Sequence, residues 1–301
     1  MDSSSVSITD PDARGSGWRE VVGAYVALTK PRIIELLLIT TVPAMVLAAE
    51  GWPGTWLVLM TLLGGTLSAG GANTLNNYID RDIDQEMKRT SRRPLPRHRV
   101  EPSNALWFGI ILGILGFFVL WVTSNLLAAS ISTAALLFYV FVYSLTLKRT
   151  TPQNIVIGGA AGAAPVLVGW AAVTDALALP AWILFAIVFY WTPPHFWALA
   201  LRYKDDYAAV EVPMLPVVAG PKKTAQQIII YSVMLVFVTL WLVPVSDLGW
   251  IYGISAAVLG AWMIFDSVRL FYRPDTAMNL FRTSTIYLSL LFAAIWVDVV
   301  I

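Results

Sequence analysis

The sequence predicts an all-α, polytopic membrane protein, and three observations lead to this prediction. Of its 301 residues, 57% are apolar and only 13% are charged, whereas soluble domains carry roughly 25% charged residues. Nine apolar runs are long enough to cross a bilayer core of about 30 Å as helices. These runs are continuous, which excludes the alternating strands of about ten residues that build membrane barrels.

The nine predicted spans follow one another with short links, which carry breakers such as Pro53, Gly54 and Asn125. Residues 1–24 begin with a Ser-, Asp- and Gly-rich stretch and are expected to form a flexible cytoplasmic tail. Residues 25–301 are expected to form a single membrane domain surrounded by lipid. Its spans cover residues 33–49, 55–77, 105–123, 127–147, 155–174, 180–200, 226–244, 250–271 and 282–300.

The basic residues all fall on one side of this arrangement. All 20 Lys and Arg lie in the N-terminal segment or around the links that follow the second, fourth, sixth and eighth spans. Basic residues near span ends stay in the cytoplasm, so the N-terminus is predicted to be cytoplasmic and the C-terminus extracytoplasmic. The simplest location is a bacterial plasma membrane.

Composition also limits the chemistry. The chain has no Cys, which excludes disulfides and thiolate zinc sites. Its net charge of +1 gives no reason to expect a nucleic-acid partner.

A first acidic cluster ends the second span, in the stretch NTLNNYIDRDIDQEMKRTSRRPLP. Asn76, Asp80 and Asp84 are spaced by four, which places their oxygens on one face of a helix. Carboxylates one turn apart repel each other unless a cation lies between them, and Mg²⁺ takes such oxygens together with substrate phosphates. The alternative is an amphipathic helix whose acids pair with neighbouring arginines in water. We favour the metal site because the cluster extends directly from an apolar span.

A second acidic cluster ends the sixth span, in FWALALRYKDDYAAVEVPMLP, where Asp205 and Asp206 follow Lys204. Both clusters close an even-numbered span and lead into a Pro-rich segment. This pattern indicates a degenerate repeat of four helices followed by a ninth helix. Two facing clusters can hold two metal ions around one diphosphate and neutralise a leaving group.

Four stretches of the chain resemble a known family: NNYIDRDIDQEMKRTSRRPLP, LTLKRTTPQNIVIGGAAGAAPVLVGW, WTPPHFWALALRYKDDY and VPMLPVVAG. They are similar to the UbiA-type intramembrane prenyltransferases, and to their protoheme IX farnesyltransferase (heme O synthase) branch in particular. The similarity covers about residues 25–300. NxxxDxxxD alone indicates the superfamily, whereas KRTTPQN and TPPHFW point to the heme branch.

The resemblance implies a nine-helix, UbiA-like bundle with a cavity that opens to the cytoplasm. It implies Mg²⁺ as cofactor, farnesyl diphosphate as donor, heme b as acceptor and a heme A synthase acting downstream. The implied metal ligands and diphosphate contacts are Asn76, Asp80, Asp84, Asp205 and Asp206, with Arg93, Lys148 and Lys204 as cationic diphosphate contacts. One departure is visible, because the family pattern implies Gly or Asn where this chain has Glu211.

The implied chemistry separates charge. We expect Mg²⁺ held by Asp80, Asp84 and Asp206 to stabilise the leaving diphosphate. The heme vinyl group then attacks the farnesyl carbon, and water adds to the resulting heme cation. Tyr139 and Tyr143 are candidates for stabilising the allylic cation, although an aromatic belt at the membrane interface would explain them equally well.

One further position carries an open alternative, and two others carry an expected ion pair. His195 in TPPHFW is either a heme contact, such as an axial ligand, or a buried residue bonded to a carbonyl freed by Pro193 and Pro194. Within the spans, Asp266 is expected to pair with Arg269 and Glu35 with Arg32, by their helical spacing.

Two other functions fit parts of the sequence. One is an aromatic or quinone-precursor prenyltransferase with the same metal site and a different acceptor. The other is a secondary transporter, but transporters place ionisable groups near the bilayer midplane, whereas here they gather at one face.

Overall fold

The computed structural model describes residues 17–301, apart from the side chains at positions 33 and 36–38. Within this range, eight helical segments are long and apolar enough to cross a membrane. They are α3 (Thr55–Ile79), α5 (Pro102–Thr123), the continuous run of α6 (Leu126–Leu137), η1 (Phe138–Leu147) and α7 (Lys148–Thr150), α8 (Asn154–Thr174), α9 (Leu179–Arg202), α12 (Gly220–Trp241) with η2 (Val243–Val245), α13 (Trp250–Tyr272), and η3 (Pro274–Thr276) with α14 (Ala277–Val300).

The first predicted span corresponds to helix α2 (Pro31–Ala48). Its stretch Ile39–Ala48 is an apolar helix too short to cross a bilayer by itself. Eight of the nine predicted spans are therefore confirmed as helices of membrane-spanning length. The remaining one, the first span at residues 33–49, stays a prediction.

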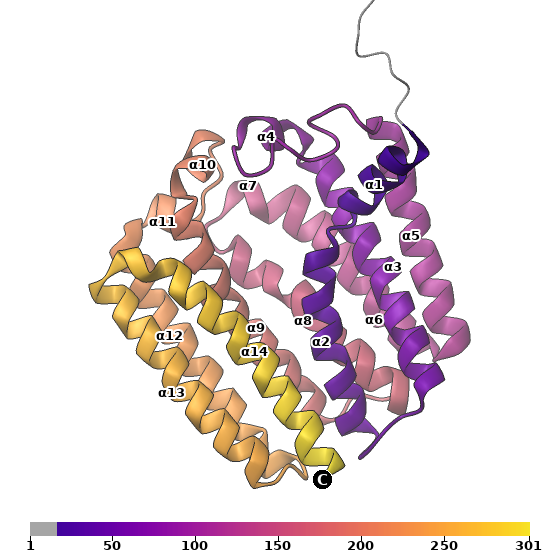
Figure 1. The fold of residues 1–301 in the computed structure, drawn as a ribbon, viewed down its shortest axis with the longest axis vertical. Coiled ribbons are helices and arrows are strands. Elements are labelled where there is room, and N and C mark those ends of the chain that lie inside the picture. Colours follow the sequence, from indigo (N-terminus) through magenta and orange to yellow (C-terminus); the bar gives the residue numbers. More distant parts are fainter. Residues whose placement is uncertain (1–16) are drawn as a thin grey trace, which may run out of the picture.

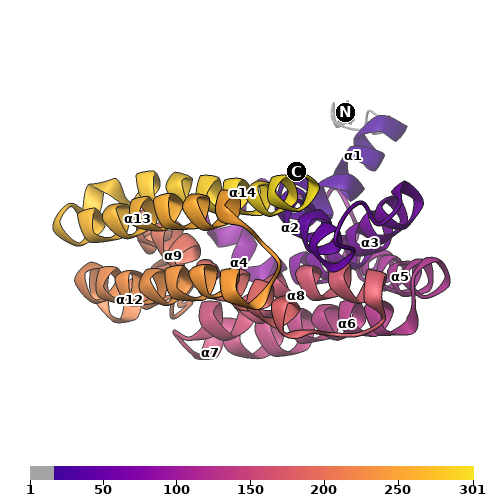
Figure 2. The same cartoon turned by 90° about the horizontal axis from the view of Figure 1, so that it is seen from below.

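In the described part of the chain, the long helices form a closed ring. Each packs against the next along the chain from α2 through α3, α5, α6, α8, α9, α12 and α13 to α14, and α14 returns to pack against α2. Figures 1 and 2 show this path, with α12, α13 and α14 on one side and α3, α5 and α6 on the other. Such a ring leaves room for a central cavity.

Small residues allow α3 and α5 to approach closely. A Cβ atom added to Gly71 would lie 2.7 Å from the carbonyl oxygen of Gly109, and one added to Gly116 would lie 2.8 Å from the backbone nitrogen of Ser68. Glycine at such contacts is typical of membrane helices, which associate through backbone packing. The tight pair holds the end of α3, and with it the first acidic cluster, in a fixed place.

Four short helices gather at one end of the bundle, at the top of Figure 1. They are α4 (Arg81–Glu86), α7, α10 (Lys204–Ala209) and α11 (Leu215–Val218). They follow the predicted second, fourth and sixth spans, so both acidic clusters lie at the same end of the molecule.

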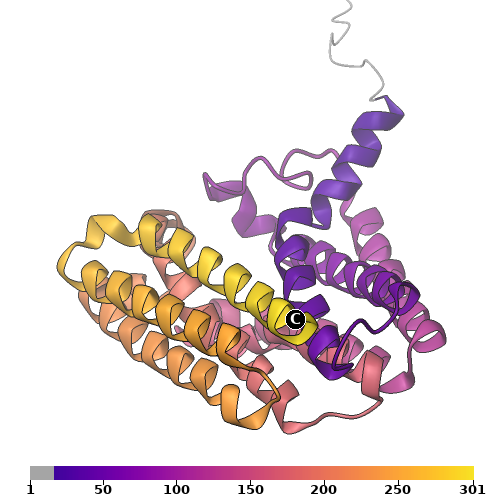
Figure 3. The same cartoon turned by 60° about the horizontal axis from the view of Figure 1, so that its bottom comes forward.

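Helix α1 (Trp18–Leu28) spans residue 24, the predicted boundary between the N-terminal tail and the membrane domain. It projects beyond the ends of the neighbouring helices in Figure 3. Ala24 and Leu28 are buried in a small cluster with Leu95, Val100 and Ala105, and burial of these apolar side chains explains why the segment is helical. The prediction for residues 1–16 lies outside the described residues.

Candidate active site

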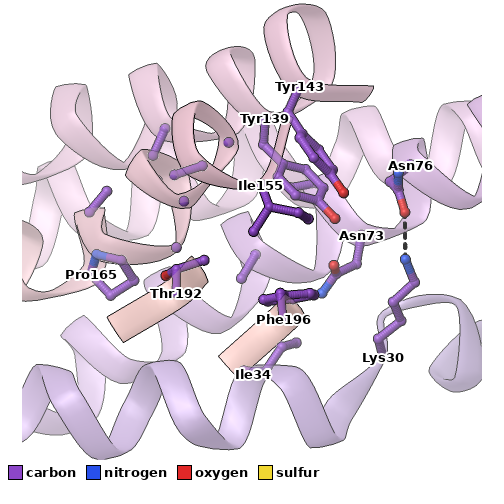
Figure 4. A pocket seen from close by; sticks show the side chains of 18 of the residues that line it. Lys30, Ile34, Asn73, Asn76, Tyr139, Tyr143, Ile155, Pro165, Thr192 and Phe196 are labelled. Atoms are coloured by element: carbon purple, nitrogen blue, oxygen red, sulfur yellow. Dashed lines mark hydrogen bonds between the residues drawn. The ribbon is translucent and has the colours of Figure 1, made fainter. Parts of the chain in front are cut away.

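A cavity of about 620 Å³ opens within the helix ring. Figure 4 shows Lys30 and Asn76 at one end of it and Pro165 toward the other, with Tyr139 and Tyr143 above and Ile34 below. The end near Asn76 is charged. The remaining lining is mostly apolar or small, which suits a long hydrocarbon substrate with a charged head.

The first acidic cluster lines the charged end. Asp80 is fully buried and Asp84 is 2% exposed. The backbone N–H of Asp80 donates to the carbonyl of Asn76, and that of Asp84 donates to the carbonyl of Asp80, each at 2.9 Å. The four-residue spacing is thus kept across the junction between α3 and α4, and all three side chains face the cavity.

Cations from three separate segments neutralise this cluster. Lys148 forms an ion pair with Asp80, and Arg93 forms one with Asp84 at 2.6 Å. Asn76 donates to Asp80 Oδ2 at 2.7 Å and accepts a hydrogen bond from Lys30 Nζ at 2.6 Å. The structure therefore brings together six residues, five of which the sequence assigned to this site.

Lys30 is the member that sequence reasoning missed, because it belongs to the basic residues that indicate the cytoplasmic side of the membrane. It precedes α2 with a left-handed backbone (φ 54°), a conformation that non-glycine residues rarely adopt and that often marks functional sites. Burial, with Arg93 nearby, lowers the pKa of the Lys30 amine well below its ordinary value. The Lys30–Pro31 step at the start of a span is the sequence signal that could have drawn attention to it.

The donor atoms suit a magnesium ion shared with a substrate. Asp80 Oδ1 is buried and has no hydrogen-bond partner in the part of the chain that the structure describes. Among residues 17–301, no three or more His, Cys, Asp or Glu side chains group closely enough to hold a metal by themselves. Because Mg²⁺ commonly takes one or two protein carboxylates and completes its shell with water and phosphate oxygens, the site fits a magnesium–diphosphate complex better than an all-protein metal centre.

The second acidic cluster lies apart from the cavity. Asp205 is exposed, and none of Lys204, Asp205 and Asp206 lines the cavity. Asp206 accepts a hydrogen bond at 3.2 Å from the backbone N–H of Arg89, which belongs to the loop after α4. The two loops are therefore linked, while the metal and diphosphate roles of this second cluster stay predictions.

Asp82 provides a contrast within the same short helix. It points away from the cavity, and Arg149 donates two hydrogen bonds of 2.7 Å to its carboxylate. These hydrogen bonds lower the pKa of Asp82 to about 2. It is thus a charged acid close to the cluster that takes no part in it.

Two stacked tyrosines line the cavity next to the cluster. Tyr139 and Tyr143 lie in η1, a π-helix, with ring centroids 5.2 Å apart and planes at 26°. The Ser144 hydroxyl donates to the Tyr139 carbonyl and accepts from Asn76, which ties this helix to the acidic cluster. Wide helical turns of this kind are frequent at functional sites. The position favours a role in the cavity over an interfacial belt.

His195 also lines the cavity, from α9. Its Nδ1 lies 2.8 Å from the hydroxyl of Ser284 on α14. The expected alternative, a hydrogen bond between His195 and a carbonyl freed by Pro193 and Pro194, is wrong. The ring is hydrogen-bonded to the Ser284 hydroxyl of the facing helix instead. Helix α9 continues through both prolines.

Two predicted ion pairs are absent from the described part of the molecule. Asp266 is buried against α14 and accepts a hydrogen bond of 2.6 Å from Thr283, whereas Arg269 is exposed. Glu35 and Arg32 are both exposed and form no ion pair there. Helical spacing places the members of each pair near each other, but neighbouring helices and solvent provide better partners.

A charged, buried mouth and an apolar cavity within a ring of membrane helices suit an intramembrane enzyme whose substrate has a charged head and a hydrocarbon body. Residues 37–293 match the UbiA prenyltransferase family, and the chain belongs to that family. It is a multi-pass membrane protein and an enzyme of the prenyltransferase class.

Close relatives narrow the resemblance to one branch. The chain is 54% identical over 277 residues to the protoheme IX farnesyltransferase of Parafrankia sp., with 90% of this chain and 88% of the relative covered. It is 51% identical over 305 residues to the protoheme IX farnesyltransferase of Salinispora tropica, with 99% and 95% covered. The resemblance drawn from the motifs is confirmed.

Solved structures share the fold. A structure of digeranylgeranylglyceryl phosphate synthase in membranes aligns with a TM-score of 0.78 at 20% identity, covering 93% of this chain and 99% of that one. A UbiA homologue from Archaeoglobus fulgidus bound to GPP and Mg²⁺ aligns with a TM-score of 0.65 at 16% identity, covering 90% and 99%. The predicted UbiA-like bundle is confirmed.

Proposed function

We propose that the chain transfers the farnesyl group of farnesyl diphosphate to a vinyl group of heme b, with addition of water, to give heme o and diphosphate. The relatives at more than 50% identity, named protoheme IX farnesyltransferase, support this assignment. The structural observation that carries it is the buried Asn76, Asp80 and Asp84 cluster at the mouth of an apolar cavity.

The charged end of the cavity receives the diphosphate. Asn76, Asp80 and Asp84 would hold Mg²⁺, which supplies charge neutralisation for the leaving group; the support is their chemistry and the unpartnered Asp80 Oδ1. Arg93 and Lys148 exchange their carboxylate partners for phosphate oxygens, which carry more negative charge. We assign Lys204, Asp205 and Asp206 to the opposite side of the same diphosphate, on the loop that Asp206 already ties to Arg89.

The bond changes balance without an external oxidant. The allylic C–O bond breaks and its electron pair leaves with the diphosphate. The π electrons of the heme vinyl group form the new C–C bond, and water adds to the remaining heme-side cation and releases a proton. The ring faces of Tyr139 and Tyr143 stabilise the allylic cation, and the enclosed cavity keeps water away until that bond has formed.

The rest of the lining receives the two hydrocarbon bodies. The polar head of the donor lies at Asn76, so its chain extends along the small residues of α3 and α8 toward Pro165. Heme b lies against the aromatic wall formed by α9 and α14, where His195 is its contact. The product would then pass to a heme A synthase.

The proposal includes a location. Nine spans place the N-terminus in the cytoplasm, the C-terminus outside and the cavity mouth on the cytoplasmic face of a bacterial plasma membrane, as the distribution of Lys and Arg indicates. Residues 25–301 act as one membrane domain, built from two four-helix halves and a ninth helix.

The test is an acceptor assay with mass detection. Membranes containing the chain are incubated with farnesyl diphosphate, Mg²⁺ and either heme b or 4-hydroxybenzoate. We expect a heme product heavier by one hydrated farnesyl group and no prenylated benzoate. Prenylation of the benzoate without a heme product would contradict the proposal and identify an aromatic prenyltransferase.

A further inference from the structure

We propose that Gly158 of α8 is a positioning residue for farnesyl transfer, because its missing side chain leaves the space in which the ring of Tyr143 lies. The inference rests on the proposed function, in which the ring faces of Tyr139 and Tyr143 stabilise the allylic cation. Gly158 itself touches no reacting atom and acts only through Tyr143.

The Tyr143 ring occupies the position that a side chain at residue 158 would need. A Cβ atom added to Gly158 would overlap Cδ2 of that ring and would lie 3.0 Å from both Cγ and Cε2, whereas non-bonded carbon atoms prefer separations of about 3.5–4.0 Å. Figure 4 shows both tyrosine rings extending from η1 toward Ile155, which lies one turn before Gly158 on α8. Only a residue without a Cβ atom therefore allows this placement of the ring.

Rotation of the ring cannot relieve this contact. The Cγ atom of Tyr143 lies on the axis of rotation about the Cβ–Cγ bond, so turning the ring leaves Cγ 3.0 Å from the added carbon. Relief requires a shift of the whole Tyr143 side chain or of η1 itself. Such a shift would also disturb the neighbouring ring, because Tyr139 stacks on Tyr143 with ring centroids 5.2 Å apart.

The backbone of η1 is tied to the acidic cluster on α3. The Ser144 hydroxyl donates to the Tyr139 carbonyl at 2.9 Å, and Asn76 donates to that hydroxyl at 3.0 Å. Asn76 also donates to Asp80. Helix η1 packs against both α3 and α8, so a side chain at residue 158 would displace the tyrosines relative to the end of the cavity where the diphosphate binds.

Other glycines of the cavity have different surroundings. Gly162 lies one turn after Gly158 on the same face of α8, and a Cβ atom there, as at Gly65 of α3, would meet nothing within 4 Å. A Cβ atom at Gly159 would meet Thr192 at 3.1 Å. Among the cavity-lining glycines of the described chain, Gly158 alone has its side-chain space filled by an aromatic ring.

The expected consequence concerns the fate of the allylic cation. In the proposed transfer, the π electrons of the heme vinyl group form a C–C bond to the allylic carbon. When the Tyr143 ring no longer covers that carbon, water reaches it first. The water oxygen then forms a C–O bond, a proton is released, and the products are farnesol and diphosphate. Displacement of Tyr143 should therefore divert the donor from transfer to hydrolysis.

The first measurement compares both products in membranes that contain Gly158→Ala and are supplied with farnesyl diphosphate, heme b and Mg²⁺. Formation of the heme product should fall about 30-fold, the contribution of an aromatic face over a desolvated cation, and the ratio of farnesol to heme product should rise. Donor binding should match the wild type, because the acidic cluster binds the diphosphate. An unchanged product ratio, or a loss of donor binding as large as the loss of transfer, would overturn the proposal.

The second measurement separates positioning from general packing. Tyr143→Ala removes the ring and should itself raise the share of farnesol. In this background Gly158→Ala should have no further effect, because Gly158 acts through Tyr143. Equal losses from Gly158→Ala in both backgrounds would overturn the proposal. If Gly158→Ala alone fails to fold, the double variant should fold because the overlap is absent, and a double variant that also fails to fold would overturn the proposal.

Gly260→Ala is the matched control, since a Cβ atom there would lie 2.8 Å from Val236 Cγ1 and Gly260 does not line the cavity. It should lower the unfolding temperature without raising the share of farnesol, and a rise equal to that in Gly158→Ala would overturn the proposal. A wild-type protein that does not farnesylate heme overturns the proposed function, whereas an active enzyme whose product ratio is unaffected by Gly158→Ala overturns only this inference.

Discussion

The two acidic clusters have similar sequences but different surroundings. Both follow a membrane helix, and both carry aspartates among basic residues. In the first, the positions that face the cavity at four-residue spacing are Asn76, Asp80 and Asp84. In the second, the N–H of Tyr203 donates to the carbonyl of Leu199 and that of Tyr207 to Tyr203.

The same four-residue row in the second cluster therefore carries a leucine and two tyrosines. Leu199 and Tyr207 line the cavity, whereas Asp205 and Asp206 fall on other faces of α10. Helical register, and not the presence of acidic residues, decides which cluster lines the cavity.

Removal of one carboxylate from the buried cluster should have the largest effect. Asp80→Asn removes a negative charge that no other described side chain can replace, and farnesyl transfer should fall by about 10²- to 10³-fold or more, as for other single groups that stabilise transition-state charge. The measurement is the initial rate of heme product formation in membranes with equal amounts of protein.

Asp82→Asn is the control for this change, because Asp82 lies in the same segment and pairs with Arg149 outside the cavity. It should keep most of the activity. Equal losses in the two variants would remove the distinction between the buried acid and its exposed neighbour.

The second largest effect is expected from the lysines that accompany the two clusters, because only one of them pairs with a buried carboxylate. Lys148→Met removes the ion-pair partner of the fully buried Asp80. Breaking such a pair costs about 3–5 kcal/mol of stability, and the variant should also bind farnesyl diphosphate more weakly. Thermal unfolding and donor binding are the two measurements.

Lys204→Met is the matched change at the second cluster. Lys204 does not line the cavity. The unfolding temperature of the Lys204→Met protein should therefore change little, and its donor binding should weaken less than that of Lys148→Met. A larger loss of donor binding in Lys204→Met than in Lys148→Met would mean that the second cluster contributes more to diphosphate binding than the first.

A substitution that fills the cavity behind the first cluster should have a smaller effect, which concerns the length of the prenyl chain that is accepted. Gly162 lines the cavity, and a Cβ atom there would meet nothing within 4 Å. Gly162→Leu should fill the apolar depth without disturbing the helices and should raise the ratio of geranyl to farnesyl transfer at least tenfold, a typical gain from steric exclusion in an apolar pocket.

Competition between the two donors measures this ratio. Gly23→Leu, on α1 and equally open but outside the cavity, is the control. An unchanged ratio in Gly162→Leu would place the prenyl chain elsewhere.

The smallest expected effect concerns the loop of the second cluster. Glu211 has a left-handed backbone (φ 54°), which is unfavourable by about 1–2 kcal/mol for a side chain with a Cβ atom. Glu211→Gly should therefore raise stability by about 1 kcal/mol. Thermal unfolding in detergent measures this gain.

Glu101→Gly provides the opposite control, because Glu101 has an ordinary extended backbone (φ −64°). Its replacement by glycine should stabilise nothing. A gain in both variants would point to charge, and not to backbone strain, as the cause.

Much of this architecture could be predicted from the sequence. Continuous apolar runs located the long helices, because bilayer thickness fixes their length. The four-residue spacing of Asn76, Asp80 and Asp84 predicted a shared face, because local helical geometry is nearly the same in every protein. Glu211 was recognised as unusual, and its left-handed backbone explains why Gly or Asn would suit that position.

Other features depend on contacts between distant segments and could not be predicted in this way. Lys30 reaches the cluster only because the chain turns before α2, and Ser284 meets His195 only because α14 packs against α9. Composition identified Asp205 and Asp206 as a second cluster, but it did not reveal the helical register, which leaves both residues outside the cavity lining. Helix α1 could not be predicted from its own sequence, because it is buried against Leu95 and Val100 of a loop about 70 residues away.

Binding of farnesyl diphosphate with and without Mg²⁺ tests the central claim most directly, because that claim assigns the binding of the metal and the diphosphate to Asp80 and Asp84. Isothermal calorimetry on the wild-type chain should show donor binding that is lost on chelation and restored when Mg²⁺ returns, and Asp80→Asn should abolish this Mg²⁺ dependence. Tight binding and full transfer after complete chelation, or an unchanged Mg²⁺ dependence in Asp80→Asn, would contradict the account.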